Sequence, residues 1–207
     1  MRLFAAVRPP ADVLDHLDLA LRVVRAGAVT DDRTSPVRWT AEENRHLTVA
    51  FYGEVPAGVS EDLARGLART ADEAEPFELR LRGAGVFSHR TLWVGASGEV
   101  EAMNRLSARA AEAGEEAGTR PDERLRSRPH LTVGRVSPSA RPTRRSRRRP
   151  DDEPPSAPVD ALVRALAVYE GPAWTVEELL LVESEPGAGR GGGPLYTPVD
   201  SWRLGGA

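Results

Sequence analysis

The chain has 207 residues, a net charge of −3 and 40% hydrophobic residues, values typical of a globular protein that forms one domain or two lobes around a shared core. The slightly negative charge excludes a global basic field of the kind that drives non-specific binding to nucleic acid. The absence of cysteine excludes disulfides, thiolate metal sites and a cysteine nucleophile.

The periodicity of apolar residues predicts strands and helices that alternate along the chain. In the first part of the chain it predicts strands at Leu3–Val7, Val37–Trp39, His46–Tyr52 and Phe77–Leu81, and helices over 12–25 and 59–67. In the second part it predicts strands at Thr91–Ala96, His130–Val136, Trp174–Val182, Leu195–Val199 and Trp202–Leu204, and helices over 100–110 and 159–168.

The order strand, helix, His-containing strand, helix, strand therefore occurs twice. This duplication predicts an α+β fold with two pseudo-symmetric lobes, in which two antiparallel sheets with outer helices surround a central groove. We expect residues 1–207 to form one such bilobed domain.

The apolar stretch Leu3–Val7 is too short for the core of a signal peptide. No window approaches the roughly 20 apolar residues of a membrane span. We therefore expect a cytoplasmic protein with no membrane partner.

An insertion over 137–157 interrupts the second copy, with an Arg-rich run at 141–149 followed by acidic and proline residues. Such a composition cannot build a core, which predicts a flexible loop. Two interpretations remain open for it: a solvated surface loop whose charges partly neutralise each other, or an electrostatic arm that captures RNA phosphates.

The tetrapeptide His-Leu-Thr-Val occurs at 46–49 and again at 130–133, and it contains two of the four histidines of the chain. Successive side chains of a strand face opposite sides, so His and Thr share one face while Leu and Val pack into the core. If the two lobes face each other, four polar side chains converge on one groove: His46, Thr48, His130 and Thr132.

Two imidazoles and two hydroxyls suit the cleavage of a phosphodiester without a metal or cofactor. Because histidine titrates near pH ~6.5, one ring can act as a base while the other acts as an acid, which accelerates reactions by typically ~10²–10⁴-fold. The threonines can donate to the non-bridging phosphate oxygens, and a strained 2′,3′-cyclic phosphate is a favourable substrate. A zinc site is disfavoured, because no third histidine, cysteine or suitably spaced acid accompanies the pair.

At these residues the chain resembles the 2H phosphoesterases, and within them the LigT-like RNA 2′,3′-cyclic phosphodiesterases first described as 2′-5′ RNA ligases. The resemblance extends over nearly the full length and includes these segments: Met1–Phe4, Arg38-Trp39, His46–Glu54, Gly83–Phe87, Leu92-Trp93, Arg128–Arg135, Leu181–Ser184 and Tyr196.

The resemblance implies that His46 is the proton donor and His130 the proton acceptor in opening a cyclic phosphate to a 2′-phosphate. It also implies that Arg135 lies at the phosphate, although strand alternation places Arg135 on the core face unless a bulge or its long side chain intervenes. Phe51 is the equivalent residue in the first copy. With Tyr52, which stands where the family more often has Leu, it completes the substrate-binding candidates.

We therefore expect a monomeric enzyme whose partner is RNA with 2′,3′-cyclic phosphate ends, tRNA fragments being one candidate source. One alternative is a related activity on small cyclic nucleotides or ADP-ribose cyclic phosphate. Another is a module that binds RNA ends or joins them through 2′-5′ linkages.

Three other signals are interpreted as structural. His16 is expected on the surface of its helix and His89 in a hairpin loop. The glycine-rich segment 187–192 precedes a strand rather than a helix, which favours a hairpin over a dinucleotide site.

Overall fold

The computed structural model describes residues 1–27, 37–120, 128–136 and 158–206. The insertion predicted over 137–157 lies outside these residues. The strands are β1 (Arg2–Val7), β2 (Val37–Trp39), β3 (Leu47–Glu54), β4 (Phe77–Phe87), β5 (Thr91–Gly98), β6 (His130–Val136), β7 (Glu170–Val176), β8 (Glu178–Glu185) and β9 (Leu195–Arg203). The helices are α1 (Ala11–Gly27), α2 (Ala57–Asp72), α3 (Val100–Glu116) and α4 (Pro158–Leu166), with short 3-10 helices η1 (Glu42–Asn44) and η3 (Arg190–Gly192).

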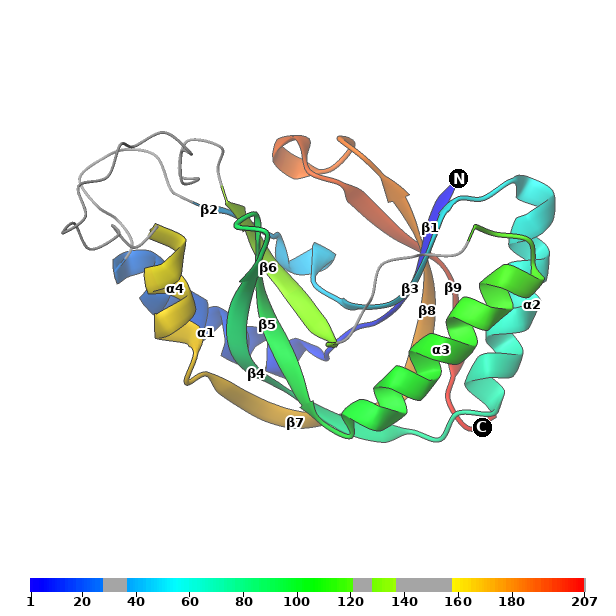
Figure 1. Cartoon of the computed structure of the whole chain (residues 1–207), viewed down its shortest axis with the longest axis horizontal. Coiled ribbons are helices and arrows are strands. Elements are labelled where there is room, and N and C mark those ends of the chain that lie inside the picture. Colours follow the sequence, from blue (N-terminus) through cyan, green and yellow to red (C-terminus); the bar gives the residue numbers. More distant parts are fainter. Residues whose placement is uncertain (28–36, 121–127, 137–157, 207) are drawn as a thin grey trace, which may run out of the picture.

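The strands form a single antiparallel sheet in the order β7-β4-β5-β6-β3-β1-β8-β9, and β2 pairs with β6. The sheet has two halves, which correspond to the two sheets expected from the sequence. Between them, β3 and β6 share one cross-strand pair, Leu47 opposite Leu131. The halves diverge from this junction, so the sheet as a whole is curled (Figure 1).

The four helices pack on the outer sides of the two halves (Figure 1). Helices α1 and α4 contact β7 and β4, whereas α2 and α3 contact each other and the strands β3, β8 and β9. Each helix buries one apolar stripe, as its periodicity predicts. In α1 this stripe consists of Val13, Leu14, Leu17 and Leu21, which are at most 2% exposed.

The two sequence repeats are interwoven rather than stacked one after the other. Helix α1 follows β1 but packs against β7 in the other half, and α3 follows β5 but packs against β3. Likewise β4, which belongs to the first repeat, pairs with β5 of the second repeat. In the same way β8, which belongs to the second repeat, pairs with β1 of the first. Each half of the core therefore needs residues from both repeats.

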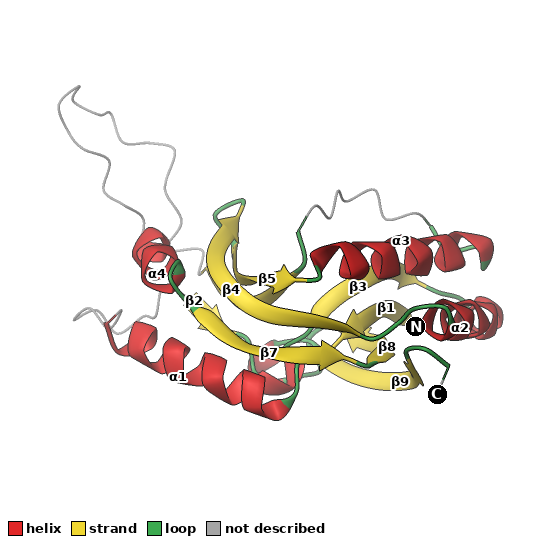
Figure 2. Cartoon of the chain, turned by 90° about the horizontal axis from the view of Figure 1, so that it is seen from below, coloured by secondary structure: helices red, strands yellow, loops and turns green. Residues whose placement is uncertain are grey.

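Two of the predicted strand assignments differ from the structure. The segment predicted as one strand, Trp174–Val182, belongs to β7 and β8, which lie in opposite halves of the sheet (Figure 2). No glycine or proline marks the crossing at Glu177, so the pattern gave no signal for it. Conversely, the two strands predicted near the C-terminus form the single edge strand β9, which accommodates Pro198 at a register shift against β8.

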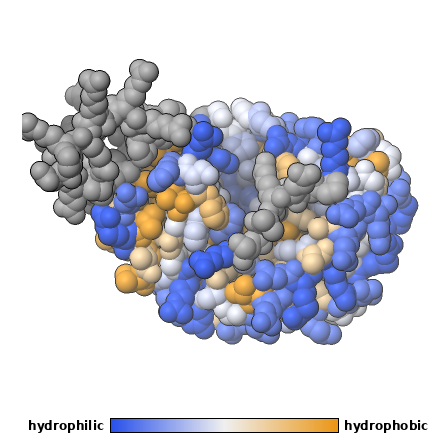
Figure 3. Space-filling view, viewed as in Figure 1, coloured by the Kyte–Doolittle hydropathy of each residue, from blue (hydrophilic) through white to orange (hydrophobic). Residues whose placement is uncertain are grey.

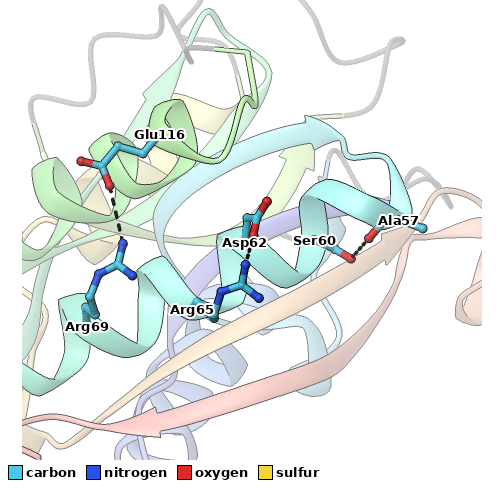
Figure 4. A network of polar contacts seen from close by, with 6 residues as sticks. All are labelled: Ala57, Ser60, Asp62, Arg65, Arg69 and Glu116. Carbon is cyan, nitrogen blue, oxygen red and sulfur yellow. Dashed lines mark hydrogen bonds and ion pairs between the residues drawn. The ribbon is translucent and has the colours of Figure 1, made fainter.

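Exposed ion pairs cover the outer surface of α2 and α3. Arg69 lies 3.6 Å from Glu116 across the two helices, and Arg65 pairs with Asp62 within α2 (Figure 4). Hydrophilic side chains dominate this side of the molecule (Figure 3). Each such pair contributes at most about 1 kcal/mol of stability. Among the described residues, no helix combines the length and apolar content that a membrane crossing needs.

Candidate active site

The inner side of the curled sheet contains a groove with a volume of about 910 Å³, located where the two halves meet. The four polar residues of the doubled tetrapeptide all line it: His46, Thr48, His130 and Thr132. The structure therefore brings together the four side chains that strand alternation places on one face. His16 and His89 do not line the groove: His16 lies exposed on α1, and His89 lies exposed in the β4–β5 turn.

The pairing of Leu47 with Leu131 positions the two histidine–threonine sets relative to each other. In a regular antiparallel register, the residues flanking such a pair are also opposite each other, so that His46 faces Thr132 and His130 faces Thr48. The two histidines are then diagonal neighbours on the two strands. The backbones of residues in such positions are about 7–8 Å apart in a regular ladder, and their Cβ atoms are somewhat closer. Both leucines are fully buried and anchor the two strands to the core.

Each His-Leu-Thr-Val segment contains a β-bulge at its valine. In β3, Ala5 and Ala6 pair with Ala50 and Thr48, which leaves Val49 as the extra residue. In β6, Leu92 and Trp93 pair with Gly134 and Thr132, which leaves Val133 as the extra residue. An extra residue reverses the alternation of side chains beyond it.

The bulges explain why the residues after the motifs face the groove. Arg135 is exposed and lines it, and the half-buried Phe51 does the same from β3. Simple alternation would have placed Arg135 in the core; the bulge at Val133 moves it to the face that carries Thr132.

Tyr52 does not belong to the groove, and its prediction as a substrate-binding residue is wrong. Because the bulge at Val49 turns Phe51 inward, the next side chain points to the helices. Tyr52 is 4% exposed, and its hydroxyl donates to the carbonyl of Ala110 in α3 at 3.0 Å. Its ring lies so close to Gly114 that an added Cβ there would approach it to 2.7 Å.

Both histidine rings are oriented by the backbone two residues upstream. Nδ1 of His46 lies 3.0 Å from the carbonyl oxygen of Asn44, and Nδ1 of His130 lies 3.0 Å from that of Arg128. A carbonyl can only accept a hydrogen bond, so each Nδ1 carries the hydrogen. The ring atom that can gain or lose a proton at this site is therefore Nε2.

Two aromatic rings contact each histidine. The ring centroid of His46 lies 4.7 Å from that of Phe4 and 5.2 Å from that of Tyr196. That of His130 lies 4.8 Å from Phe87 and 6.1 Å from Trp93. Burial raises the pKa of the Tyr196 hydroxyl, and the positive charges of Arg135 and Arg2 oppose that rise.

Sequence reasoning did not identify these four aromatic residues as neighbours of the histidines. The resemblance did single out the segment Gly83–Phe87 and Trp93. The structure explains why this segment has a glycine at position 85. A Cβ at Gly85 would lie 2.3 Å from the Trp93 ring, so glycine is needed for that ring to lie across β4.

An ion pair between a buried arginine and a half-buried aspartate lies directly beside the first motif. Arg45, 3% exposed, donates from Nη2 to Asp18 of α1 at 2.7 Å. The hydrogen bond from Arg45 lowers the pKa of the Asp18 carboxyl, with burial opposing it and the charges of Arg45 and Arg25 assisting. The pair therefore fixes α1 to the segment that leads into His46.

The comparisons with known proteins agree with this geometry. A model of the 2′-5′ RNA ligase superfamily matches residues 38–187, which include both tetrapeptides. The chain belongs to this superfamily. A Methanothermobacter thermautotrophicus protein named RNA 2′,3′-cyclic phosphodiesterase is 29% identical over 208 residues, 99% of this chain and 99% of that protein.

Two further comparisons support the assignment. A Thermus thermophilus protein with the same name is 33% identical over 220 residues, covering 96% of this chain and 98% of that protein. The crystal structure of TT0787, also from Thermus thermophilus, aligns with a TM-score of 0.69 at 27% identity, covering 100% of this chain and 99% of the other. The expected α+β bilobed architecture is thereby confirmed.

The groove of this superfamily member is strongly cationic although the whole chain is not. Within the described residues, the groove lining contains no Asp or Glu. It contains six arginines: Arg2, Arg38, Arg90, Arg128, Arg135 and Arg190. Such a surface favours anionic ligands. In the same part of the chain, no cluster of three or more His, Cys, Asp and Glu side chains is suited to hold a metal ion.

Proposed function

We propose that this protein hydrolyses the 2′,3′-cyclic phosphate ends of RNA to 2′-phosphates, using His46 and His130 as an acid–base pair without a metal. One observation carries the proposal: two histidines, each with Nδ1 held by a carbonyl, line the same cationic groove from opposite sides of the Leu47–Leu131 pair. The names of the relatives from Methanothermobacter and Thermus support the substrate class.

The proposed reaction requires one histidine to accept a proton and the other histidine to donate one. Nε2 of neutral His130 takes a proton from water as the water oxygen bonds to phosphorus. The bond from phosphorus to O3′ breaks, and Nε2 of protonated His46 gives its proton to O3′. Exchange with solvent restores both rings.

The remaining groove residues would stabilise the charge that develops on phosphorus. The hydroxyls of Thr48 and Thr132 can donate to the non-bridging oxygens, whose negative charge increases in the transition state. Arg135 can add a charge-assisted contact to the same oxygens. Phe51, with the Arg2 guanidinium 5.1 Å from its ring centre, offers an apolar wall.

The assay that tests this function compares three substrates in the presence of EDTA: an oligonucleotide with a cyclic phosphate end, the same oligonucleotide with a 2′-phosphate, and ADP-ribose cyclic phosphate. We expect hydrolysis of the first alone, with a 2′-phosphate product identified against synthetic 2′- and 3′-phosphate standards. Loss of activity in EDTA contradicts the metal-free mechanism. Binding without turnover identifies an end-binding module instead, and turnover of ADP-ribose cyclic phosphate alone identifies the other phosphodiesterase activity.

A further inference from the structure

Asn44 contacts two segments of the groove wall at once. Its backbone carbonyl oxygen lies 3.0 Å from Nδ1 of His46, and its side-chain Nδ2 donates to the carbonyl of Pro194 at 3.0 Å. Pro194 lies 150 residues further along the chain, in the hairpin between β8 and β9. All three residues line the groove. Asn44 therefore connects the first motif histidine to a hairpin that is remote in sequence.

A third contact joins the same hairpin to the same histidine. Tyr196 follows Pro194 by two residues, and its ring centroid lies 5.2 Å from that of His46 with the ring planes at 81°. The imidazole of His46 is thus in contact with the Asn44 carbonyl through Nδ1 and with Tyr196 through the ring. The Asn44 side chain ties the segments that supply these two contacts to each other.

Neither of these segments is strongly fixed by its own structure. Asn44 ends the 3-10 helix η1, which has three residues and no buried side chain, and a helix of one turn is not stable by itself. In the hairpin end, 186–194, five of nine residues are glycines, which are costly to order. Within the described residues, the bond from Asn44 is the one side-chain hydrogen bond that joins this hairpin end to another element.

The residue after Asn44 fixes the same segment on the side away from the groove. Arg45 is buried and donates to Asp18 of α1, and it does not line the groove. The Asn44 amide supplies the contact on the groove side. Because the contact of Arg45 with α1 does not involve the amide, loss of the amide should affect the orientation of His46 more than the stability of the fold.

Building on the proposed function, we infer that the side chain of Asn44 is a positioning group for His46. In the proposed reaction, Nε2 of His46 must point at O3′ when the bond from O3′ to phosphorus breaks. The direction of Nε2 depends on where the carbonyl holds Nδ1, on the other side of the ring. A displacement of a catalytic group by about 1 Å can lower the rate by about 10²-fold. Asn44 therefore acts through His46 and does not contact the reacting atoms.

A double-mutant cycle of Asn44→Ala and His46→Ala tests this inference, with kcat and KM measured for an oligonucleotide with a cyclic phosphate end. Asn44→Ala alone should lower kcat about tenfold and leave KM within about twofold of the wild type. In the His46→Ala background the same substitution should change kcat by less than about twofold, because no ring remains to be positioned. A rise in KM with unchanged kcat, or an equal loss of kcat in both backgrounds, would overturn the inference.

Two further variants separate the amide from its surroundings. Glu43→Ala is the matched control, because Glu43 precedes Asn44 in η1, is exposed and lies outside the groove; it should keep the wild-type kcat. Asn44→Asp keeps the shape of the side chain, but an ionised carboxylate cannot donate to the Pro194 carbonyl, so kcat should fall at least as far as in Asn44→Ala. A loss of kcat in Glu43→Ala as large as that in Asn44→Ala, or a wild-type kcat in Asn44→Asp, would contradict a role for the amide.

The orientation of His46 can also be measured without turnover, by NMR of the imidazole nitrogens at about pH 8, where an ordinary histidine is neutral. The wild-type ring should carry its hydrogen on Nδ1, and Asn44→Ala should introduce the form protonated on Nε2. If the wild type does not hydrolyse the RNA end but this shift occurs, the proposed function fails and Asn44 still positions His46. If the wild type is active and Asn44→Ala changes neither the spectrum nor kcat, the inference fails and the function stands.

Discussion

Leu47 of β3 lies directly opposite Leu131 of β6, and each is the second residue of a His-Leu-Thr-Val segment. The two copies thus meet at corresponding residues, related by a local two-fold axis through the pair. This relationship places one histidine and one threonine on either side of the junction, facing the groove. It follows that a duplicated strand can build a site that neither copy contains alone.

The two histidines should be needed equally. We predict that His46→Ala and His130→Ala each lower kcat for a cyclic-phosphate oligonucleotide by ~10²-fold or more, because each removes one proton transfer. Circular dichroism and melting should show an intact fold, since both rings lie on the groove side. A single variant with near-normal kcat would count heavily against the assigned pair.

The packing of Trp93 against His130 should matter for turnover. In Gly85→Ala the new Cβ would press into the Trp93 ring, which we expect to cost about 1–3 kcal/mol of stability and to lower kcat about tenfold by moving His130. Adding Trp93→Phe should restore part of kcat by making room.

Gly58→Ala is the control for this substitution, because outside its chain neighbours and its own helix backbone no atom lies within 4 Å of the position a Cβ would take there. It should keep the wild-type kcat, with stability unchanged or slightly raised because alanine favours the helix. If Gly85→Ala retains full kcat as well, the ring contact has no role in orienting His130.

Neighbouring residues in β3 should separate stability from binding. Tyr52→Phe removes the hydrogen bond to Ala110 and should lower the free energy of unfolding by about 1 kcal/mol with kcat and KM unchanged. Phe51→Leu should raise KM for RNA with a smaller effect on stability. A KM effect in Tyr52→Phe would show that the hydroxyl serves the substrate after all.

The ion pair between Asp18 and Arg45 should make stability depend on pH. Asp18→Asn leaves the buried guanidinium without its carboxylate and should cost about 1–3 kcal/mol near neutral pH. Because the folded pKa of Asp18 lies below its ordinary value of 3.8, the wild-type carboxylate stabilises the fold above that value, and this contribution disappears as pH falls through the folded pKa.

Urea unfolding of the wild type and Asp18→Asn at several pH values measures this difference. It should be constant from neutral pH down to about pH 5 and shrink below about pH 4. A difference that does not change with pH would show that the loss comes from packing rather than from the charge.

Parts of the fold that depend on local pattern were predictable from the sequence. The strand bounds Val37–Trp39 and His130–Val136 match those of β2 and β6, and the four helices occur where apolar stripes predict them. The interweaving of the repeats was not predictable, because local periodicity does not specify which half of the sheet a helix covers. For the same reason the sequence did not predict that β4 and β8 each pair with a strand of the other repeat.

The site was predictable to the extent that it lies within one strand. Alternation places His46 and Thr48 on one face. Tyr52, which came from the resemblance, lies on the opposite face because a bulge at Val49 reverses the alternation beyond it. The opposition of Arg38 and Arg135 and the contacts of Phe4 and Tyr196 with His46 depend on cross-strand register. Register between distant strands cannot be derived from one sequence without a structure.

In the proposed mechanism His46 acts as the acid and His130 as the base, and the pH dependence of kcat/KM tests these roles most directly. Over about pH 5 to about pH 8 the wild type should show a bell-shaped profile. His46→Ala should lose the decline on the alkaline side, where the acid would be deprotonated, and His130→Ala should lose the decline on the acidic side, where the base would be protonated. A flat wild-type profile, or variants that both retain both declines, would contradict the two-histidine mechanism.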